Sequence, residues 1–317
     1  MHKFLNPKNY VRRAFYFVNR HLLKSIETLI APDLDKQLSH PPIFFLGAPR
    51  SGSTLMIQVI TDALDLGYIS NRHCQWYGAP ALAERLFHPT ADRPSSDYHS
   101  SHGVAKGHYA PAECGQWWYR FFRRQPPYMT LEEVESRHMR KFRLSVAALT
   151  NAFDRPVLFK NLYASLRIQA IAKYLPESLF IITERDEVDN GHSLLEGRMR
   201  VYGDYARWWS MEPPNIESLK RLPAHEQVIE QIRQIHRTIA KDLKVSGVPE
   251  SRCLHLNYDE FCSDPLSAIK ACKEFLASHG CEVRQRGSII PLRFESRREV
   301  RIDQNLYREM SDYARGI

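Results

Sequence analysis

The chain has 317 residues, 43% of them hydrophobic and 25% charged, which is enough for one large α/β domain or two small globular domains. Its formal net charge of +8 suits an anionic partner, such as nucleic acid, a membrane surface or a phosphorylated cofactor, without choosing among them. The six cysteines form no C-x-x-C pair, which excludes a zinc or redox signature, and their low number fits free thiols in a reducing compartment.

The N-terminal thirty residues mix apolar side chains such as Phe15, Phe17 and Leu22 with the cations Arg20 and Lys24. They contain no long apolar run and no small-residue cleavage site, which argues against a signal peptide or a membrane span. We favour a helix that packs on the domain; a basic amphipathic helix on a membrane surface is the alternative. We therefore expect a helical extension over residues 1–40, an α/β domain over residues 41–317, and a soluble, cytoplasmic protein.

The first strong element is the short apolar run from Ile43 to Leu46, which lies between prolines and Gly47. This run predicts a buried strand, and Leu55 and Val59 begin the apolar face of a helix that follows. The unit is strand, glycine-containing loop, helix. Residues 67–130 are rich in proline, histidine and aromatic residues, so we expect irregular structure there that carries substrate contacts.

Apolar patterns of strand and helix alternate through the rest of the chain. We expect strands at residues 156–160, 179–183 and 253–256, and helices at 131–153, 166–175, 187–201, 228–239 and 265–278. This alternation predicts a single domain with a central, mostly parallel sheet flanked by helices on both faces. Such sheets bind ligands at the carboxyl ends of their strands, where Arg50, Lys160, Arg185 and Tyr258 all lie.

Residues 47–54 have the spacing G-x-x-x-x-G-x-T of a phosphate-binding loop. Backbone N–H groups and the positive end of the next helix can cradle phosphate oxygens, and Gly52 lets the backbone approach closely. Ser53 replaces the lysine that neutralises the β- and γ-phosphates, which argues against hydrolysis of ATP or GTP. The cation is Arg50 instead, and further donors are the hydroxyls of Ser51, Ser53 and Thr54.

The letters PRSGST of this loop resemble the 5′-phosphosulfate loop of the sulfotransferase superfamily, which uses 3′-phosphoadenosine 5′-phosphosulfate (PAPS). In that family a strand ends in an arginine, and a serine follows about two helical turns later. Both hold the 3′-phosphate of PAPS, and here they correspond to Arg185 and Ser193. The resemblance further implies that Tyr258 lies near the adenine. It spans residues 42–280 and implies a P-loop-like α/β fold.

One part of the family pattern is missing from the C-terminal region. Cytosolic members end with an R-K-G and G-x-W stretch that closes over the cofactor, and this chain has no such stretch. Arg293, Arg297, Arg298 and Arg301 could substitute for it, although an exposed basic tail explains them equally well. The resemblance is closer to bacterial and Golgi-type carbohydrate sulfotransferases than to enzymes of small phenols.

Sulfuryl transfer needs a base for the acceptor hydroxyl and a cation for the charge on the leaving phosphate, and it requires no metal ion. Arg50 is the expected cation for the leaving phosphate, and Lys160 is the second choice. The alternative for Lys160 is that it is an ordinary surface lysine with no role in the reaction. Glu113 resembles the acidic residue of a P-x-E-x-G-x-x-W stretch in bacterial relatives. His108 resembles the K-x-H histidine that is the base of cytosolic members. His73 ranks third.

The acceptor is expected to be a carbohydrate or glycolipid, because tryptophans and tyrosines at residues 76–77, 117–119 and 208–209 lie beside arginines. Core packing is expected for at least half of these rings, and lipid or protein tyrosine acceptors stay open. Three rival functions remain: a small-molecule kinase with an atypical loop and Mg²⁺, a catalytically inactive PAPS-binding protein, and a basic binder of nucleic acid or membrane. The dispersed basic residues argue against nucleic acid.

Overall fold

The computed structural model describes residues 14–30, 38–87, 93–99, 103–295 and 299–317. Its centre is one parallel sheet with the strand order β2-β3-β1-β4-β5. The strands are β1 Pro42–Gly47, β2 Gly67–Tyr68, β3 Val157–Lys160, β4 Leu179–Glu184 and β5 Cys253–Asn257. Phe44 of β1 lies in register with Phe159 and with Phe180, so its two flanking strands come from much later in the chain. The predicted single parallel α/β sheet is confirmed.

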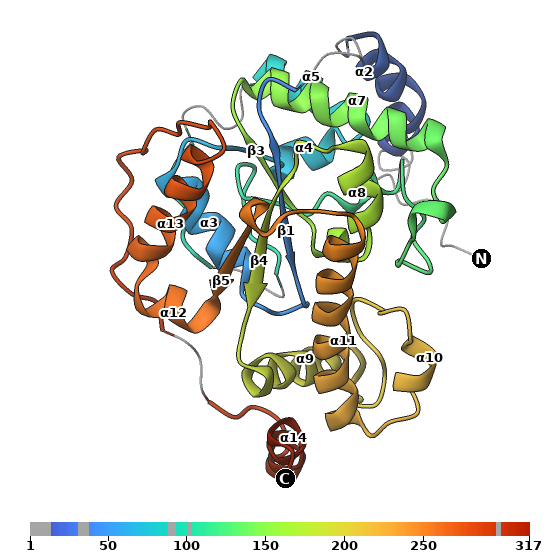
Figure 1. The fold of residues 1–317 in the computed structure, drawn as a ribbon, viewed down its shortest axis with the longest axis vertical. Coiled ribbons are helices and arrows are strands. Elements are labelled where there is room, and N and C mark those ends of the chain that lie inside the picture. Colours follow the sequence, from blue (N-terminus) through green and yellow to red (C-terminus); the bar gives the residue numbers. More distant parts are fainter. Residues whose placement is uncertain (1–13, 31–37, 88–92, 100–102, 296–298) are drawn as a thin grey trace, which may run out of the picture.

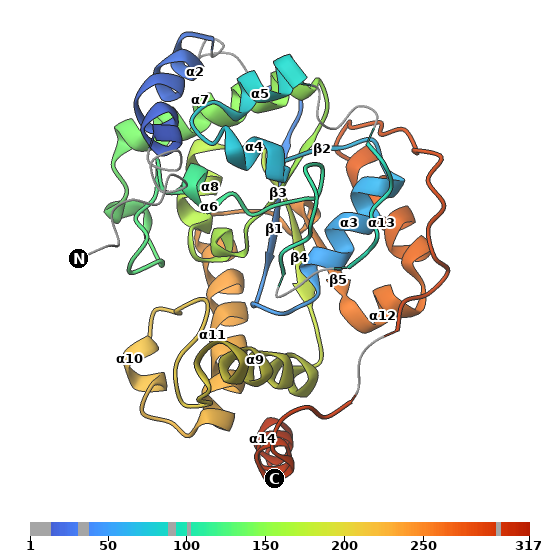
Figure 2. The ribbon, with the colours of Figure 1, turned by 180° about the vertical axis from the view of Figure 1, so that it is seen from behind.

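Helices cover both faces of this sheet (Figures 1 and 2), because side chains of a strand alternate between its two faces. Ile43 and Phe45 pack into one hydrophobic cluster, while Phe44 and Leu46 pack into the other. The first cluster is completed by α3 Ser53–Ala63, α12 Tyr258–Ser263 and α13 Pro265–Ala277. The second is completed by α7 Ser136–Phe153, α8 Ile168–Tyr174, α9 Glu187–Tyr202, α11 Ala224–Val245 and α14 Gln304–Arg315.

The region 67–130, expected to be irregular, contains short regular elements in its described parts. They are β2, α4 Asn71–Gln75, α5 Pro80–Phe87 and α6 Gly115–Trp118. Such short helices show little periodicity and depend on their ends instead. At the start of α4 the backbone N–H of Ser70 donates to Nδ1 of His73 (3.0 Å). Other elements absent from the prediction are α10 Ile216–Leu219, α12, α14, and the 3₁₀ turns η2 Leu131–Glu133, η3 Leu162–Leu166 and η4 Glu250–Arg252.

The N-terminal segment forms a π-helical stretch, η1 Val18–Leu23, that continues into α2 Lys24–Ile30. It packs beside α5 and α7 at the end of the molecule opposite α9 and α14 (Figures 1 and 2). A helix packed on the domain, the favoured interpretation, is therefore what the structure contains. Within the described ranges, no helix combines the length and apolarity needed to cross a bilayer.

Candidate active site

The phosphate-type loop after β1 is fixed by two buried hydroxyls from neighbouring segments. Ser165 of η3 accepts the N–H of Gly47 (2.9 Å) and donates to the carbonyl of the same residue (3.2 Å). On the β4 side, Thr183 donates to the carbonyl of Leu46 (3.2 Å), so its oxygen accepts from the hydroxyl of Ser51 (2.7 Å). Ser51 is fully buried in this bond. Its side chain therefore supports the loop and does not line the cavity described below.

Gly52 lies where the loop enters α3, and only a glycine fits there. Its φ is 84°, in the left-handed region, and an added Cβ would lie 2.0 Å from the ring of Tyr258. Arg50 also has a positive φ, 71°, which is uncommon for a residue with a side chain and is typical of functional loops. The backbone is thus held in a strained shape against the Tyr258 ring.

The two sequence motifs meet at this loop, although more than a hundred residues separate them. Nε of Arg50 donates to Oγ of Ser193 on α9 (3.0 Å), and Nη1 of Arg185 donates to the carbonyl of Arg50 (3.2 Å). The Arg185 guanidinium lies 4.7 Å from the centre of the Tyr258 ring. Its buried Nε has no hydrogen-bond partner among the described residues. Burial lowers the pKa of Arg50, and Glu196 partly offsets this effect.

A cavity of about 420 Å³ opens over this cluster. Its volume falls in the usual range of small-molecule sites, roughly 300–1,000 Å³. Of the residues expected from the sequence, it is lined by Arg50, Gly52, Ser53, Thr54, Glu113, Arg185, Ser193 and Tyr258. Trp209, one of the aromatic residues expected at the acceptor site, also lines it, as do residues that the sequence did not indicate, among them Tyr98, Tyr163, His192, Glu196 and Ser210.

Lys160, the last residue of β3, lies beneath the cavity. It is 3% exposed, and its Nζ donates to the carbonyl of Gly103 (2.7 Å), which also accepts from Oγ1 of Thr54 (3.2 Å). Burial lowers the pKa of Lys160, Glu113 raises it in part, and Arg50 lowers it further. Lys160 is therefore a buried side chain that does not line the cavity but is near enough to Glu113 and Arg50 for their charges to act on it. The alternative of a surface lysine is wrong.

The three candidate bases occupy different places. Glu113 lines the cavity, and its loop is held by a hydrogen bond from Nδ2 of Asn161 to its carbonyl (3.1 Å). His108 is exposed and is not among the cavity-lining residues. His73 is buried with Nδ1 accepting from Ser70, so its Nε2 carries the proton and donates to Glu84 (3.1 Å). Only Glu113 is brought to the cavity, because His73 is used to begin α4.

Part of the C-terminal region reaches the cavity, although this region lacks the family's R-K-G and G-x-W closing stretch. The backbone N–H of Arg301 donates to Nε2 of His192 (3.0 Å), and its guanidinium lies 3.6 Å from Glu196. Burial lowers the pKa of His192. Of the other arginines considered there, Arg293 is exposed, and residues 297 and 298 lie outside the described residues. In the sequence, Arg301 was only one of four arginines that could substitute for the closing stretch, and nothing distinguished it from the other three.

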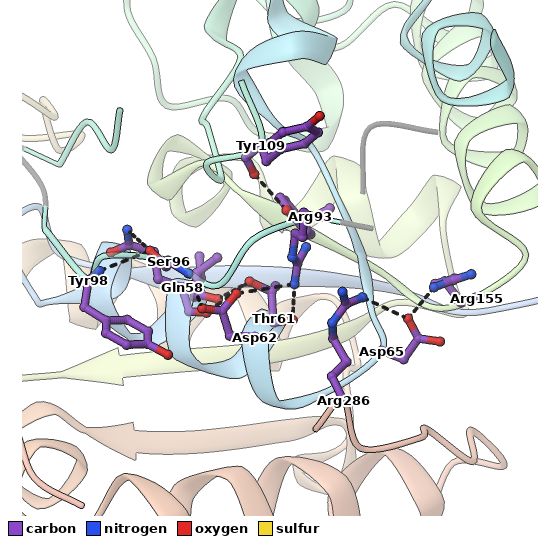
Figure 3. A network of polar contacts seen from close by, with 12 residues as sticks. Gln58, Thr61, Asp62, Asp65, Arg93, Ser96, Tyr98, Tyr109, Arg155 and Arg286 are labelled. Carbon is purple, nitrogen blue, oxygen red and sulfur yellow. Dashed lines mark hydrogen bonds and ion pairs between the residues drawn. The ribbon is translucent and has the colours of Figure 1, made fainter. Parts of the chain in front are cut away.

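A buried polar network on α3 positions another wall of the cavity (Figure 3). Arg93 bonds the carbonyl of Thr61 and lies 3.7 Å from Asp62, while the N–H of Ser96 donates to Asp62 (2.6 Å). These contacts fix the extended segment 93–99. They bring Tyr98 to the cavity, where its ring meets Phe294 edge-on at 5.4 Å.

The aromatic residues divide as expected between core and cavity. Trp117 and Trp118 are fully buried among Phe142 and Phe159. Trp209 instead lines the cavity and covers Gly197, where an added Cβ would lie 2.0 Å from its ring. In the described part of the chain, no three His, Cys, Asp or Glu side chains are grouped so as to hold a metal ion.

Comparison with known proteins gives one family and one kind of solved structure. The family model that matches, over residues 41–278, is described as the sulfotransferase family. Sulfotransferase STF9 from Mycobacterium avium is 16% identical, with a TM-score of 0.53 over 94% of this chain and 73% of that chain. Sulfotransferase STF1 from Mycobacterium tuberculosis H37Rv is 12% identical, with a TM-score of 0.50 over 97% and 80% of the two chains. No curated protein matches the sequence.

Proposed function

Because this chain belongs to the sulfotransferase family, whose members transfer a sulfuryl group, we propose that its donor is PAPS and its acceptor a carbohydrate or glycolipid hydroxyl. One observation carries the donor assignment. Arg50, Ser193 and Arg185 come from two distant motifs, contact one another and face a single cavity. Two cationic groups and several hydroxyls suit a ligand with phosphate at both its 5′ and 3′ ends.

In this proposal the donor's two anionic ends are bound by different elements. The 5′-phosphosulfate is held by the N-terminal amides of α3 with Arg50, Ser53 and Thr54. The 3′-phosphate is held by Ser193 and by Arg185, whose unpartnered Nε supports the assignment. Tyr258 is placed near the adenine. Arg301 takes the place of the family's closing stretch.

The transfer itself is an in-line displacement at sulfur. The acceptor hydroxyl gives its proton to the carboxylate of Glu113, and its oxygen forms the new bond to sulfur. The bond from sulfur to the 5′-phosphate oxygen breaks, which leaves 3′-phosphoadenosine 5′-phosphate. Arg50 offsets the charge that builds on this leaving phosphate, and Lys160 adds a second positive charge behind the loop.

The acceptor proposal rests on aromatic residues that line the same cavity. Trp209 and Tyr163 present aromatic surface to the cavity on which Glu113 also lies. Aromatic faces pack against the apolar faces of sugar rings, and a nearby carboxylate suits a sugar hydroxyl. A cytoplasmic location is part of the same proposal, because the described cysteines are all free thiols.

The donor assignment is tested by thermal stabilisation with 3′-phosphoadenosine 5′-phosphate, compared with ATP plus Mg²⁺. A ligand that binds only the native state must raise its stability. We expect stabilisation by the 3′-phosphate nucleotide alone, its loss in Arg185→Ala, and its retention in the control Arg207→Ala, whose guanidinium stacks on Tyr202. Stabilisation only by ATP plus Mg²⁺ would overturn the proposal in favour of a kinase. Binding without transfer to any acceptor would leave an inactive PAPS-binding protein.

A further inference from the structure

The N-terminal segment buries two polar residues and, apart from Leu23, exposes its large apolar ones, which is unusual for a helix on a soluble domain. Asn19 is 0% exposed and Glu27 is 2% exposed, whereas Phe17 is 58% and Leu22 55% exposed. We call the outward-facing group the N-terminal apolar face. It consists of Phe15, Tyr16, Phe17, Val18, Leu22 and Ile26, all of which are exposed. Large apolar side chains gathered in this way on a surface mark an interaction site.

Buried polar bonds prevent this segment from turning its apolar side inward. Nδ2 of Asn19 donates to the carbonyl of Gln75 (3.1 Å), and its Oδ1 accepts the N–H of Gly78 (2.9 Å). Glu27 accepts from Arg120 (2.9 Å) and from Ser145 (3.0 Å). Breaking either set would leave buried groups without partners, which is costly. The orientation of the segment is therefore specified, and the exposure of its apolar side chains is a consequence of that orientation.

Two features indicate what this face contacts. Between residues 14 and 27 the sequence holds the cations Arg20 and Lys24 and one carboxylate, Glu27, which is buried against Arg120. Arg20 is exposed, whereas Lys24 is half-buried beside Arg120 and Lys141. The exposed side of the segment is therefore apolar, with the positive charge of Arg20 beside it. It also lies at the end of the molecule away from α9 (Figures 1 and 2), the helix whose His192, Ser193 and Glu196 line the cavity. The π-helical stretch of η1 is a rare distortion that is frequent at functional sites.

We propose that the N-terminal apolar face docks this protein on a bilayer surface rich in anionic lipids. Aromatic and aliphatic side chains enter the interface, while Arg20 lies at the level of the lipid phosphates. A second copy of the chain fits less well, because it would bring the same positive charges together. The overall charge of +8 adds long-range attraction to an anionic surface. This docking goes beyond sulfuryl transfer and does not depend on the proposed donor or acceptor.

The test is co-sedimentation of the full chain with vesicles of phosphatidylglycerol mixed with phosphatidylcholine, compared with phosphatidylcholine alone. We expect binding to the anionic vesicles only, and about a tenfold weaker partition for the double variant Phe17→Ser, Leu22→Ser. Both side chains are exposed, so its thermal unfolding should match that of the wild type. The matched control is Ile289→Ser, Leu292→Ser, which removes side chains that are 91% and 74% exposed elsewhere. It should bind like the wild type.

Three results would overturn the proposal. The first is no difference between anionic and neutral vesicles, and the second is an equal loss in the control variant. The third is a dimer in vesicle-free solution, measured by light scattering, that Phe17→Ser, Leu22→Ser dissociates; it would assign the face to a second copy. Arg20→Glu gives a further check, because charge reversal should weaken binding more at low salt than at high salt.

Discussion

The two sides of the cavity are built in different ways. The donor side consists of the loop after β1, the start of α9 and Tyr258, and its parts are joined by hydrogen bonds between regular elements. The acceptor side consists of Glu113, Tyr163 and Trp209, which come from short helical turns and connections. The difference indicates that donor binding is fixed by the fold, whereas acceptor choice is set in part by connections, such as those that carry Glu113 and Trp209, that can vary without disturbing the sheet.

The largest expected effect is the loss of turnover in Glu113→Gln. Removing a general base typically lowers the rate by about 10²–10⁴-fold. Because Glu113 lies on the acceptor side, stabilisation by 3′-phosphoadenosine 5′-phosphate should not change. The rate and the thermal shift are measured on the same preparation. Normal turnover in the double variant Glu113→Ala, His108→Ala would show that neither residue is the general base.

Gly52→Ala should damage the donor side most. Its Cβ would overlap the Tyr258 ring, and a misplacement of about 1 Å in such a site can cost about a hundredfold in rate. The control is Gly203→Ala, which has φ 69° but nothing within 4 Å, so it isolates the backbone strain alone. Calorimetric titration with 3′-phosphoadenosine 5′-phosphate measures the loss. Equal affinities of the two variants would contradict the close packing of loop and ring.

Thr183→Val should weaken the support of the loop from behind. The variant leaves the Leu46 carbonyl and the Ser51 hydroxyl without their partner, which costs about 1–3 kcal/mol of unfolding free energy. Thr183→Ser keeps the hydroxyl and should recover most of the loss. Urea unfolding with and without the nucleotide separates stability from binding. A valine variant as stable as the wild type would show that these two bonds contribute nothing.

Trp209→Ala should act on the acceptor alone. Loss of its aromatic surface is expected to raise the acceptor KM roughly three- to tenfold while the donor affinity stays constant. The control is Trp76→Ala, because Trp76 contacts Phe87 and does not line the cavity. Steady-state kinetics with each substrate varied in turn measures both constants. A change in donor affinity of the same size would show that the two sides are not separable.

The smallest effect concerns pH. Burial lowers the pKa of His192 in the folded state, and the positive charges of Arg185 and Arg301 act in the same direction against Glu196 and Asp189. In the unfolded chain the histidine has its ordinary pKa of about 6.5, so below that pH the unfolded state binds more protons than the folded state. The free energy of unfolding is therefore not reduced by His192 above pH 6.5, and it falls as the pH is lowered below this value. His192→Asn should reduce this slope in urea unfolding. Burial of His236 leaves a residual slope; an unchanged slope would exclude His192.

The donor side could be predicted from the sequence because its residues sit at the ends of strongly patterned strands. Parallel strands bring those ends to one edge, so Arg50, Arg185 and Tyr258 could be expected to meet. What the pattern does not show is the direction of a single hydroxyl, so Ser51 was assigned to the ligand although it bonds Thr183.

The acceptor side and the N-terminal segment were less predictable for a different reason. Trp209 and Arg301 reach the cavity through connections whose path depends on tertiary packing. His73 has the chemistry of a base and serves to start a helix. In residues 14–30 a helix packed on the domain was expected, but the sequence did not indicate which of its faces is buried. Only the bonds of Asn19 and Glu27 show which side turns inward.

The central place of β1 has a consequence for synthesis on the ribosome. Its two neighbours, β3 and β4, are translated more than a hundred residues after Gly47. At roughly 5–20 residues per second, the run from Ile43 to Leu46 has no sheet partner for roughly 5–20 seconds. A bare apolar strand is prone to aggregate during that interval. Slower elongation between residues 47 and 184 should therefore lower the yield of folded protein and raise its dependence on chaperones.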